Sequence, residues 1–477
     1  MSRSLAFVAL ASFVALACGQ QIGINTPEVN PPLTWETCTT SGGCTSVNGS
    51  ITIDANYRWT HQVGGYTNCK TAAGAWNSTI CPDPTTCAAN CALEGVDYAT
   101  SGATTSGNAL TVTLTTATNS GPRIYLLDST GESYQLFKLL AKEFTFDVNL
   151  PQVGCGMNAA LYFSEMNVKG GAAATNVAGA KYGTGYCDAQ CPTGDNFIDG
   201  VANFNSTSQC CNEMDIWEAN SISNALTPHG CLQDGPYACP SSGCNGQCDS
   251  NGCGYNPYAQ GAQSFYGPGK TVDTTQTFTV ITQFITDNGL STGNLIQINR
   301  IYVQNGVVIQ NSVSSAAAGN SINAAFCEAT GASGWESTGK MVPLTKAFTT
   351  GMVLAVSLWD DPSANGMSWL DGAPTDGTCT GGVNTSAATV SATFSNIKLG
   401  DINSTYAYSP PPISSSTGPT SSKPVTTSTK PTTTSTSTAA GPTQTHYGQC
   451  GGIGYSGPTT CGSFKCTSSN PYYSQCL

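Results

Sequence analysis

The sequence predicts an all-β protein, built of two packed antiparallel sheets with long loops. Apolar and polar residues alternate from Glu143 to Leu150 and again from Leu110 to Leu114, which is the pattern of a strand with one buried face. Thr277–Thr286 and Met352–Trp359 are rich in Val, Ile, Phe and Thr, which favour strands. Gly, Asn and Pro punctuate the intervals, and no long segment keeps the period of an amphipathic helix.

The first residues predict export from the cell. Arg3 is followed by an apolar run from Leu5 to Ala17 that is too short to cross a bilayer, which is typical of a signal peptide. Cleavage after Gly19 would remove Cys18 and leave an even number of the 23 cysteines for disulfides. We therefore expect residues 1–19 to be a signal peptide and the mature protein to be secreted, with no membrane span. Glycosylation sequons fit this route and lie at Asn48, Asn77, Asn205, Asn384 and Asn403.

Charge and cysteine spacing exclude several classes of partner. The chain carries 16 Lys and Arg against 28 Asp and Glu, a formal net charge of -12, and such a chain repels nucleic acid and anionic membranes. The cysteines do not form two CxxC pairs with histidines, so we expect no metal site of the zinc type, and no cofactor is implied. Only 9% of the residues are charged, which suits a secreted protein with a neutral partner.

Composition divides the mature chain into three parts. Residues 20–405 hold 18 cysteines, enough for nine disulfides, and form the main domain. Residues 406–443 are mostly Ser, Thr and Pro, and they have too little apolar surface to offset the entropy of ordering, so we expect a linker. Residues 444–477 contain four cysteines, and two disulfides would have to hold so small a module.

Three carboxylates lie close together in the main domain. Glu213, Asp215 and Glu218 fall within six residues of a chain that is poor in charge. On a strand, Glu213 and Asp215 point to the same face, whereas Glu218 points away unless one extra residue is inserted before it. We therefore predict a β-bulge or sharp bend near Ile216–Trp217, which would bring all three carboxylates to one face.

Such a cluster can hydrolyse glycosides. A retaining glycosidase needs a nucleophile and an acid/base whose carboxyl groups are roughly 5–5.5 Å apart. A third acid beside the nucleophile can shift its pKa, and His229, shortly downstream, could assist. From the residues alone, the cluster fits a solvated strand edge or a calcium site as well, although it lacks the spacing of an EF-hand. A lone histidine such as His229 is more often structural than catalytic.

Four motifs carry a family resemblance: Ala178–Cys191, Glu213–Asn220, Ser264–Gly269 and Thr393–Ile397. Over nearly all of residues 20–405, the chain resembles glycoside hydrolase family 7, which comprises fungal endoglucanases and cellobiohydrolases. The resemblance implies a β-jelly roll of two curved sheets with a long cleft on the concave face. It also implies specific roles in a retaining reaction: Glu213 as nucleophile, Asp215 as its hydrogen-bonded partner, Glu218 as acid/base and His229 near the +1 sugar.

The resemblance further implies sugar-binding residues along the cleft. Trp359 and Trp369 match positions that stack sugars on either side of the cleavage point, and Tyr57 and Trp59 match a pair farther along. Position 57 is Tyr here, where cellobiohydrolases commonly carry Trp. Without the resemblance, such aromatics are more often core residues. Positions that line the cleft or hydrogen-bond near the cleaved bond are matched by Arg123, Asn158, Tyr162, Tyr186, Asp188 and Gln190.

Loop lengths separate the two modes of action in this family. Cys191–Cys210, Cys231–Cys253 and Asp360–Cys379 are short where cellobiohydrolases carry insertions that roof the cleft. An open cleft predicts internal cuts in cellulose and soluble β-glucans by a monomeric endo-β-1,4-glucanase. A reducing-end cellobiohydrolase on the same fold is the alternative, and a non-catalytic, lectin-like wall-binding protein is a second alternative. Breadth towards xylan is left open.

Residues 444–477 resemble the fungal family 1 cellulose-binding module. The resemblance implies the disulfides Cys450–Cys466 and Cys461–Cys476, whereas parity alone allows three pairings. One loop, Gly462–Lys465, looks one residue short of the common pattern. The flat cellulose-binding face would consist of three tyrosines with two hydrogen-bonding neighbours, namely Tyr447, Tyr472 and Tyr473 with Asn470 and Gln475.

Overall fold

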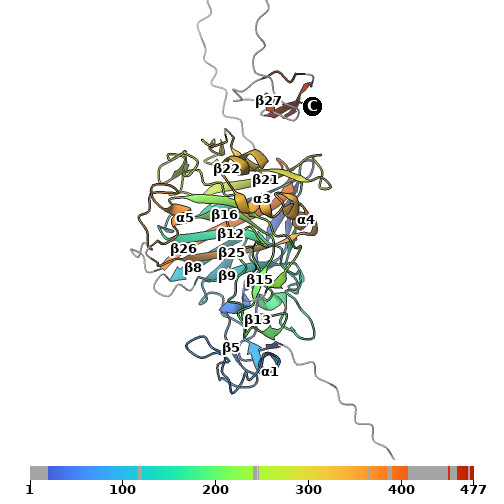
Figure 1. Cartoon of the computed structure of the whole chain (residues 1–477), viewed down its shortest axis with the longest axis vertical. Coiled ribbons are helices and arrows are strands. Elements are labelled where there is room, and N and C mark those ends of the chain that lie inside the picture. Colours follow the sequence, from blue (N-terminus) through green and yellow to red (C-terminus); the bar gives the residue numbers. More distant parts are fainter. Residues whose placement is uncertain are drawn as a thin grey trace, which may run out of the picture. The chain divides into compact units, whose positions relative to one another are not determined.

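The computed structural model describes residues 20–406 except 116–120, 240–243, 245, 318, 364 and 384–388. It also describes residues 449–451, 459–462, 464–470 and 473–476, with side chains only for 450, 451, 459–462 and 464–467. The chain divides into two compact units, Met1–Pro411 and Pro412–Leu477, and each is described by itself (Figure 1). None of the helices in these residues is long and apolar enough to cross a membrane.

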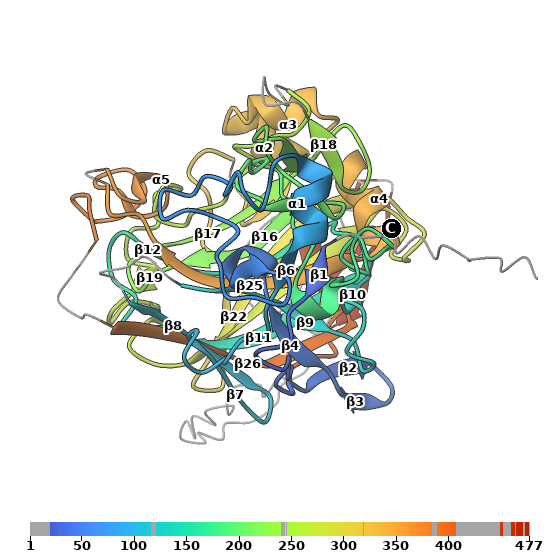
Figure 2. The same cartoon turned by 90° about the horizontal axis from the view of Figure 1, so that it is seen from below.

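The larger unit is dominated by two sheets, which Figure 2 shows stacked face to face. The ten-stranded sheet follows the order β23-β22-β21-β11-β26-β2-β3, with β24, β8 and β7 paired at its sides. Its pairs are antiparallel except β2 with β26, which run parallel. In that order its strands are Val307–Gln310, Leu295–Gln304, Phe278–Thr286, Lys142–Asn149, Thr389–Asp401, Trp35–Thr39 and Gly43–Val47, then Ser321–Asn323, Ala109–Thr115 and Ala103–Ser106.

The seven-stranded sheet is antiparallel throughout and follows the order β17-β16-β12-β25-β9-β4, with β10 paired to β25. The all-β prediction is confirmed, and each segment expected to be a strand is one, with ends shifted by a residue or two. In the order given, the strands are Asn224–His229, Glu213–Ala219, Met157–Ser164, Met352–Asp360, Arg123–Leu127 and Ser50–Ile53, then Leu136–Phe137.

The main hydrophobic core lies between the two sheets. From β11 it receives Phe144, Phe146 and Val148, as their alternation predicts. All eight residues of β12 are buried, because loop residues cover the outer face of this central strand. Odd-numbered β12 residues such as Leu161 enter the main core, whereas Tyr162 joins a second cluster with residues of the covering loop. The outer face of the seven-stranded sheet therefore carries polar and aromatic side chains in a packed setting.

Shorter elements complete the unit. A three-stranded sheet has the order β1-β6-β5, and three pairs join β13 with β14, β15 with β18, and β19 with β20. These strands are Gln21–Ile22, Cys91–Leu93, Thr60–Gln62, Phe197–Ile198, Val201–Ala202, Ser208–Cys210, Tyr237–Cys239, Tyr266–Gly267 and Val272–Asp273. The helices, none longer than the nine residues of α4, are α1 Pro84–Asn90, α2 Ala324–Ala329, α3 Ser333–Ser337, α4 Val342–Thr350 and α5 Ser368–Asp371, with 3-10 turns η1 Ala55–Tyr57 and η2 Ala180–Tyr182.

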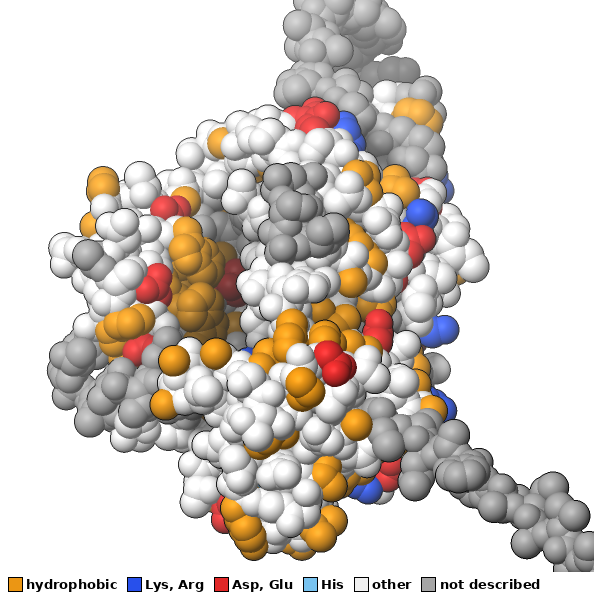
Figure 3. Space-filling model, turned by 60° about the horizontal axis from the view of Figure 1, so that its bottom comes forward, with side chains coloured by type: hydrophobic (Ala, Val, Ile, Leu, Met, Phe, Trp, Pro, Cys, Tyr) orange, Lys and Arg blue, Asp and Glu red, His pale blue; other side chains and the backbone are white. Residues whose placement is uncertain are grey.

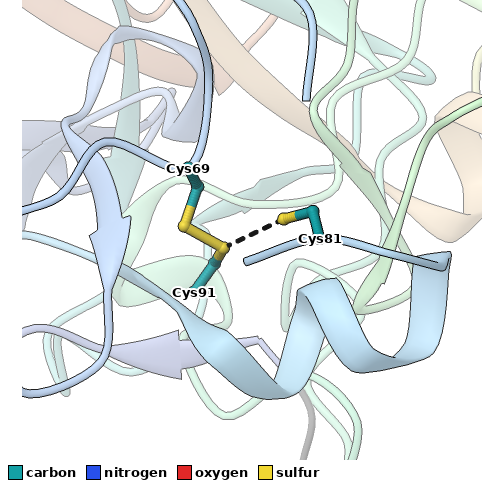
Figure 4. Close-up of side chains that lie close together, drawn as sticks. All are labelled: Cys69, Cys81 and Cys91. Carbon is teal, nitrogen blue, oxygen red and sulfur yellow. Dashed lines mark hydrogen bonds between the residues drawn. A yellow bond between two sulfur atoms is a disulfide. The ribbon is translucent and has the colours of Figure 1, made fainter. Parts of the chain in front are cut away.

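All 18 cysteines of residues 20–405 form disulfides, which fills the nine bridges that their number allows. Figure 4 shows one dense site, where the sulfur of Cys81 lies 3.4 Å from that of Cys91 in the bridge Cys69–Cys91. Cys81 is itself bonded to Cys87. The other bridges are 38–44, 155–379, 187–211, 191–210, 231–248, 239–244 and 253–327.

The smaller unit contains one three-stranded antiparallel sheet. Its order is β27-β29-β28, formed by Gln449–Gly451, Tyr473–Cys476 and Cys466–Asn470. The bridge Cys450–Cys466 is confirmed. Cys461 is also disulfide-bonded, but the side chain of its expected partner, Cys476, is not described. Of the expected binding face, Tyr447 and Tyr472 lie outside the described residues, as do the side chains of Asn470, Tyr473 and Gln475.

Candidate active site

A bulge in β16 brings the acidic cluster to one face of the sheet. The pairing of β16 with β17 shifts register between Asp215 and Glu218, and the pairing with β12 shifts at the same level. Ile216 and Trp217 are consecutive, yet both are fully buried in the main core. The bulge predicted from the sequence is therefore confirmed. It returns Glu218 to the face that already carries Glu213 and Asp215.

Glu213 is held from two sides. The backbone N–H of Ala189 donates to Glu213 Oε2 at 3.0 Å. The carboxyl group of Asp215 stands two residues away on the same face of β16, and its charge adds to burial in raising the pKa of Glu213. Both side chains are buried, at 3% and 5% exposed. Burial raises the pKa of both carboxyls, which favours a pair that keeps a proton.

His229 connects this pair to a loop. Its Nδ1 lies 2.8 Å from the backbone carbonyl oxygen of Asp249, which can only accept, so Nδ1 carries a proton. Its Nε2 lies 2.9 Å from Asp215 Oδ2. A second proton therefore sits between His229 and Asp215, on one or the other. The imidazole can thus exchange a proton with Asp215 while its orientation stays fixed.

Glu218 has a different partner. Asn158, on β12, donates from Nδ2 to Glu218 Oε1 at 3.0 Å. The amide of Asn158 cannot turn round, because its Oδ1 accepts from the backbone N–H of Ala219 at 3.0 Å. Glu218 therefore receives a fixed donor, which favours its ionised form, while burial disfavours that form.

A loop acid and two tyrosines border Glu213. Tyr186 donates to Asp188 Oδ2 at 2.6 Å, and the hydroxyl groups of Tyr186 and Tyr162 lie 3.1 Å apart. The backbone N–H of Gln190 donates to Asp188 Oδ1 at 2.8 Å, and the side chain of Gln190 is exposed. Tyr162 and Asn158 are almost fully buried, so they contribute through their neighbours rather than as open platforms.

The site resists ionisation. Burial raises the pKa of Glu213 well above its ordinary value, and the neighbouring charges of Asp215 and Asp188 raise it further. Burial raises the pKa of Asp215 in the same way, with Glu218 adding to it, and burial raises the pKa of Glu218. Each negative charge makes the next harder to create, so the cluster keeps protons at pH values at which isolated carboxyls have lost them.

Arg123 is the main cation near the cluster. It forms an ion pair with buried Asp54 at 3.0 Å, and Tyr125 also donates to that carboxyl. Its guanidinium carbon lies 3.2 Å from the ring centre of Tyr186 and 6.0 Å from that of Tyr57. Arg123 thus connects the acidic cluster to the turn η1, which ends at Tyr57.

Exposed aromatics lie on both sides of this centre. Tyr57 is 46% exposed and Trp59 38%. Trp59 stacks on His61 with ring centres 4.0 Å apart, and its Nε1 donates to Asn68 Oδ1 at 2.6 Å, which fixes the indole. An exposed, fixed aromatic ring is suited to packing against the C–H face of a sugar.

The second pair comes from β25 and α5. Trp359 is half-buried against a small cluster of Ala225, Met367 and Leu370, and Trp369 is 47% exposed. Figure 3 shows one face of the molecule hollowed, with hydrophobic and acidic side chains inside the hollow. Exposed aromatics beside buried acids can bind a neutral polymer and hydrolyse it.

One group of cysteines has the spacing of a metal site. The sulfurs of Cys69, Cys81 and Cys91 cluster tightly, but each belongs to a disulfide and so is not a thiolate ligand. At the acidic cluster, His229 Nε2 lies 2.9 Å from Asp215 Oδ2, and this contact suits proton transfer.

Sequence reasoning missed several contributors. The N–H of Ala189 and the carbonyl of Asp249 act through the backbone, and backbone atoms have no sequence signature. Asp54 and Tyr125, which hold Arg123, were also missed. Asp54 directly follows the buried strand β4 and lies three residues before Tyr57, and this position was the one signal in the sequence.

Comparison with known proteins identifies the family. The model of glycosyl hydrolase family 7 matches residues 22–406. The chain belongs to this family. A fungal cellulose binding domain matches residues 446–473. The predicted assignment to this hydrolase family, with a cellulose-binding module, is confirmed, and the protein is a glycoside hydrolase.

Relatives extend over the whole chain. Endoglucanase EG-1 of Hypocrea jecorina is 49% identical over 484 residues, covering 98% of each chain. The solved Humicola insolens endocellulase EGI is 39% identical with a TM-score of 0.76, covering 81% of this chain and all of the other. A family 7 cellobiohydrolase from Daphnia pulex gives 38% and 0.76 with the same coverage. The fold alone therefore does not separate the two modes of action.

Proposed function

We propose that this protein is a secreted endo-β-1,4-glucanase that hydrolyses internal bonds of cellulose with retention of configuration. The observation that carries the proposal is the bulge of β16, which gathers Glu213, Asp215 and Glu218 on one face between aromatic platforms. The endoglucanase relative, 49% identical along the whole chain, supports the same reaction class.

In the first step, a carboxylate oxygen of Glu213 attacks the anomeric carbon while Glu218 donates its proton to the departing glycosidic oxygen. A glycosyl ester on Glu213 forms, and the leaving chain departs as an alcohol. The raised pKa of Glu218, caused by burial, suits this role as an acid. Glu213 must be ionised to attack, and a proton kept by the Glu213–Asp215 pair can pass towards His229.

In the second step, the ionised Glu218 removes a proton from water, whose oxygen attacks the same carbon. The ester bond breaks, Glu213 leaves as a carboxylate, and Glu218 is protonated again for the next cycle. Two inversions at one carbon give net retention. Asn158 supports this step because its donated hydrogen bond stabilises the ionised form of Glu218.

The endo mode is supported by loop length. The intervals Cys191–Cys210 and Cys231–Cys253, which flank the acidic cluster, are short, and the bridges Cys191–Cys210 and Cys231–Cys248 restrain them. Short loops leave the cleft open, so a chain can enter at any point. A cellobiohydrolase is the competing function, because solved members of that class have the same fold.

Viscosity of soluble carboxymethylcellulose, followed against the release of reducing ends, tests this function. A steep fall in viscosity with few new ends means internal cuts. Slow loss of viscosity, with cellobiose accumulating from crystalline cellulose, would instead assign the cellobiohydrolase function. No new ends from either substrate would leave a wall-binding lectin and refute an enzyme acting on β-1,4-glucan.

We further propose that residues 1–19 direct secretion, that residues 406–443 are a linker, and that residues 444–477 bind crystalline cellulose. Tethering would raise the local concentration of substrate without new contacts in the cleft. The protein would act as a monomer and accept soluble β-glucans. Binding of the full chain to crystalline cellulose, compared with the variant Tyr473→Ala, tests the module, and unchanged binding by the variant would contradict the assigned face.

A further inference from the structure

The turn that carries Tyr57 is held through the residue before it. The backbone N–H of Asn56 donates to Asp54 Oδ1 at 2.6 Å. The side chain of Asn56 reaches the loop that follows Cys191, where Asn56 Oδ1 accepts from the backbone N–H of Asn196 at 2.9 Å. Asn56 Nδ2 donates to Asp195 Oδ1 at 2.7 Å. One asparagine therefore fastens the turn η1 to this loop.

The orientation of that amide is fixed. Asn56 Oδ1 faces a backbone N–H, so Nδ2 is the atom that faces Asp195, and Asp195 Oδ1 accepts whether or not its carboxyl is ionised. Asp195 is only 7% exposed, and within the described chain its Oδ2 has no hydrogen-bond partner. Such an oxygen is costly to bury as an anion and much less costly when it carries a proton.

The surroundings of Asp195 are also unfavourable to its charge. It lines a small cavity with Asn56, Thr184 and Tyr186 among others. Burial raises the pKa of Asp195 to about 7, and the charges of Asp54 and Asp188 raise it while Arg123 opposes them. Lys70 Nζ donates to Oδ1 of the next residue, Asn196, rather than to Asp195.

We propose that Asp195 is a positioning residue for the far end of the cleft: through Asn56, its buried carboxyl holds the turn that presents Tyr57 to the substrate. The inference rests on the proposed function, because it takes Tyr57 as a sugar platform. It concerns a carboxyl that the chemistry at Glu213 and Glu218 does not use, and it separates binding of long chains from hydrolysis itself.

The direction of the pH effect follows from the raised pKa. Between the ordinary pKa of an aspartate, about 4, and about 7, the unfolded chain has lost this proton and the folded chain keeps it. The contribution of Asp195 to stability is therefore greatest at acidic pH and falls as the pH rises to about 7. Above that pH the carboxylate stays buried beside Asp54 at a cost to the stability of the fold, while its hydrogen bond with Asn56 is retained.

The test compares the wild type with Asp195→Asn, which keeps an acceptor for Asn56 and cannot ionise, and with Asp195→Ala, which has no acceptor. KM is measured for cellohexaose and for a short aryl cellobioside. Asp195→Ala should raise the ratio of the first KM to the second about fivefold, as expected for a loss of about 1 kcal/mol in binding. Asp195→Asn should leave that ratio close to the wild-type value.

Melting temperatures separate this inference from the proposed function. The melting temperature of Asp195→Asn should be higher than that of the wild type at pH 7.5 and equal to it at pH 4. The control Asp199→Asn removes an exposed carboxyl of the same loop and should change neither reading. A wild type inactive on both sugars would refute the proposed function while the melting comparison still decides on Asp195. An unchanged KM ratio in active Asp195→Ala, or an equal melting shift of Asp195→Asn at both pH values, would overturn the inference.

Discussion

At the centre of the cleft, Glu213 and Glu218 stand on β16, a strand paired on both sides, whereas at the far end Tyr57 stands on a three-residue turn. Several ladder hydrogen bonds would have to break to move either glutamate, but a few side-chain hydrogen bonds hold the turn. Catalytic groups therefore need to be fixed by the sheet, whereas binding of a long polymer tolerates a platform that is held less rigidly.

The most damaging change should be at the centre. Glu213→Gln removes the nucleophile while leaving its shape, and we expect a loss of kcat on the order of 10⁴-fold or more, with binding to cellulose retained. Initial rates on a soluble glucan measure this. The exposed Glu132→Gln serves as the control and should retain full activity. Activity above about 10% of the wild-type rate would exclude Glu213 as the nucleophile.

A smaller effect is expected from the support of Glu218. Asn158→Ala deletes the hydrogen bond that lowers the pKa of Glu218 against the effect of burial, so this pKa should rise. The alkaline limb of kcat/KM, where the acid loses its proton, should move up by about one pH unit, with kcat about tenfold lower. Asn149→Ala, at the exposed end of β11, is the matched control. A limb that stays in place would mean that another group sets it.

Smaller again is the expected effect of one platform near the centre. Trp369 is 47% exposed, so Trp369→Ala should raise KM about fivefold by loss of sugar stacking and leave the melting temperature unchanged. Steady-state kinetics and thermal melting check the two readings together. A fall in melting temperature with unchanged KM would show that the indole packs the fold rather than the substrate.

The smallest effect should come from the far end itself. Tyr57→Ala should raise KM about threefold for cellohexaose and leave a short aryl cellobioside unaffected, because the short substrate does not reach the turn. The ratio of the two KM values measures this. Equal changes for both substrates would place Tyr57 next to the cleaved bond and remove the contrast between the two regions.

The sequence predicted the centre better than the rest, for a physical reason. Strand alternation and a spacing of five between Glu213 and Glu218 are local, and together they required a bulge that the pairing of β16 confirms. Contacts made between distant segments leave no such trace. Examples are the carbonyl of Asp249 on His229 and the donation from Asn56 to Asp195, 139 residues away.

The same limit applies to the sheets. Alternation predicted strands and their buried faces, including that of β11, but the parallel pairing of β2 with β26 joins segments from the two ends of the domain. Nothing in either segment indicates the direction of its neighbour. Likewise the number of cysteines predicted nine bridges, whereas the partners within residues 20–405 came only from the fold.

The neighbouring cysteines Cys210 and Cys211 bridge to Cys191 and Cys187, so the segment that carries Asp188 is tied at both ends to the chain just before Glu213. Hence the catalytic constellation is complete only in molecules whose thiols have been oxidised in the right combination. Catalytic activity per mole of protein therefore serves as an assay of maturation, and chain made in a reducing cytosol should yield little of it.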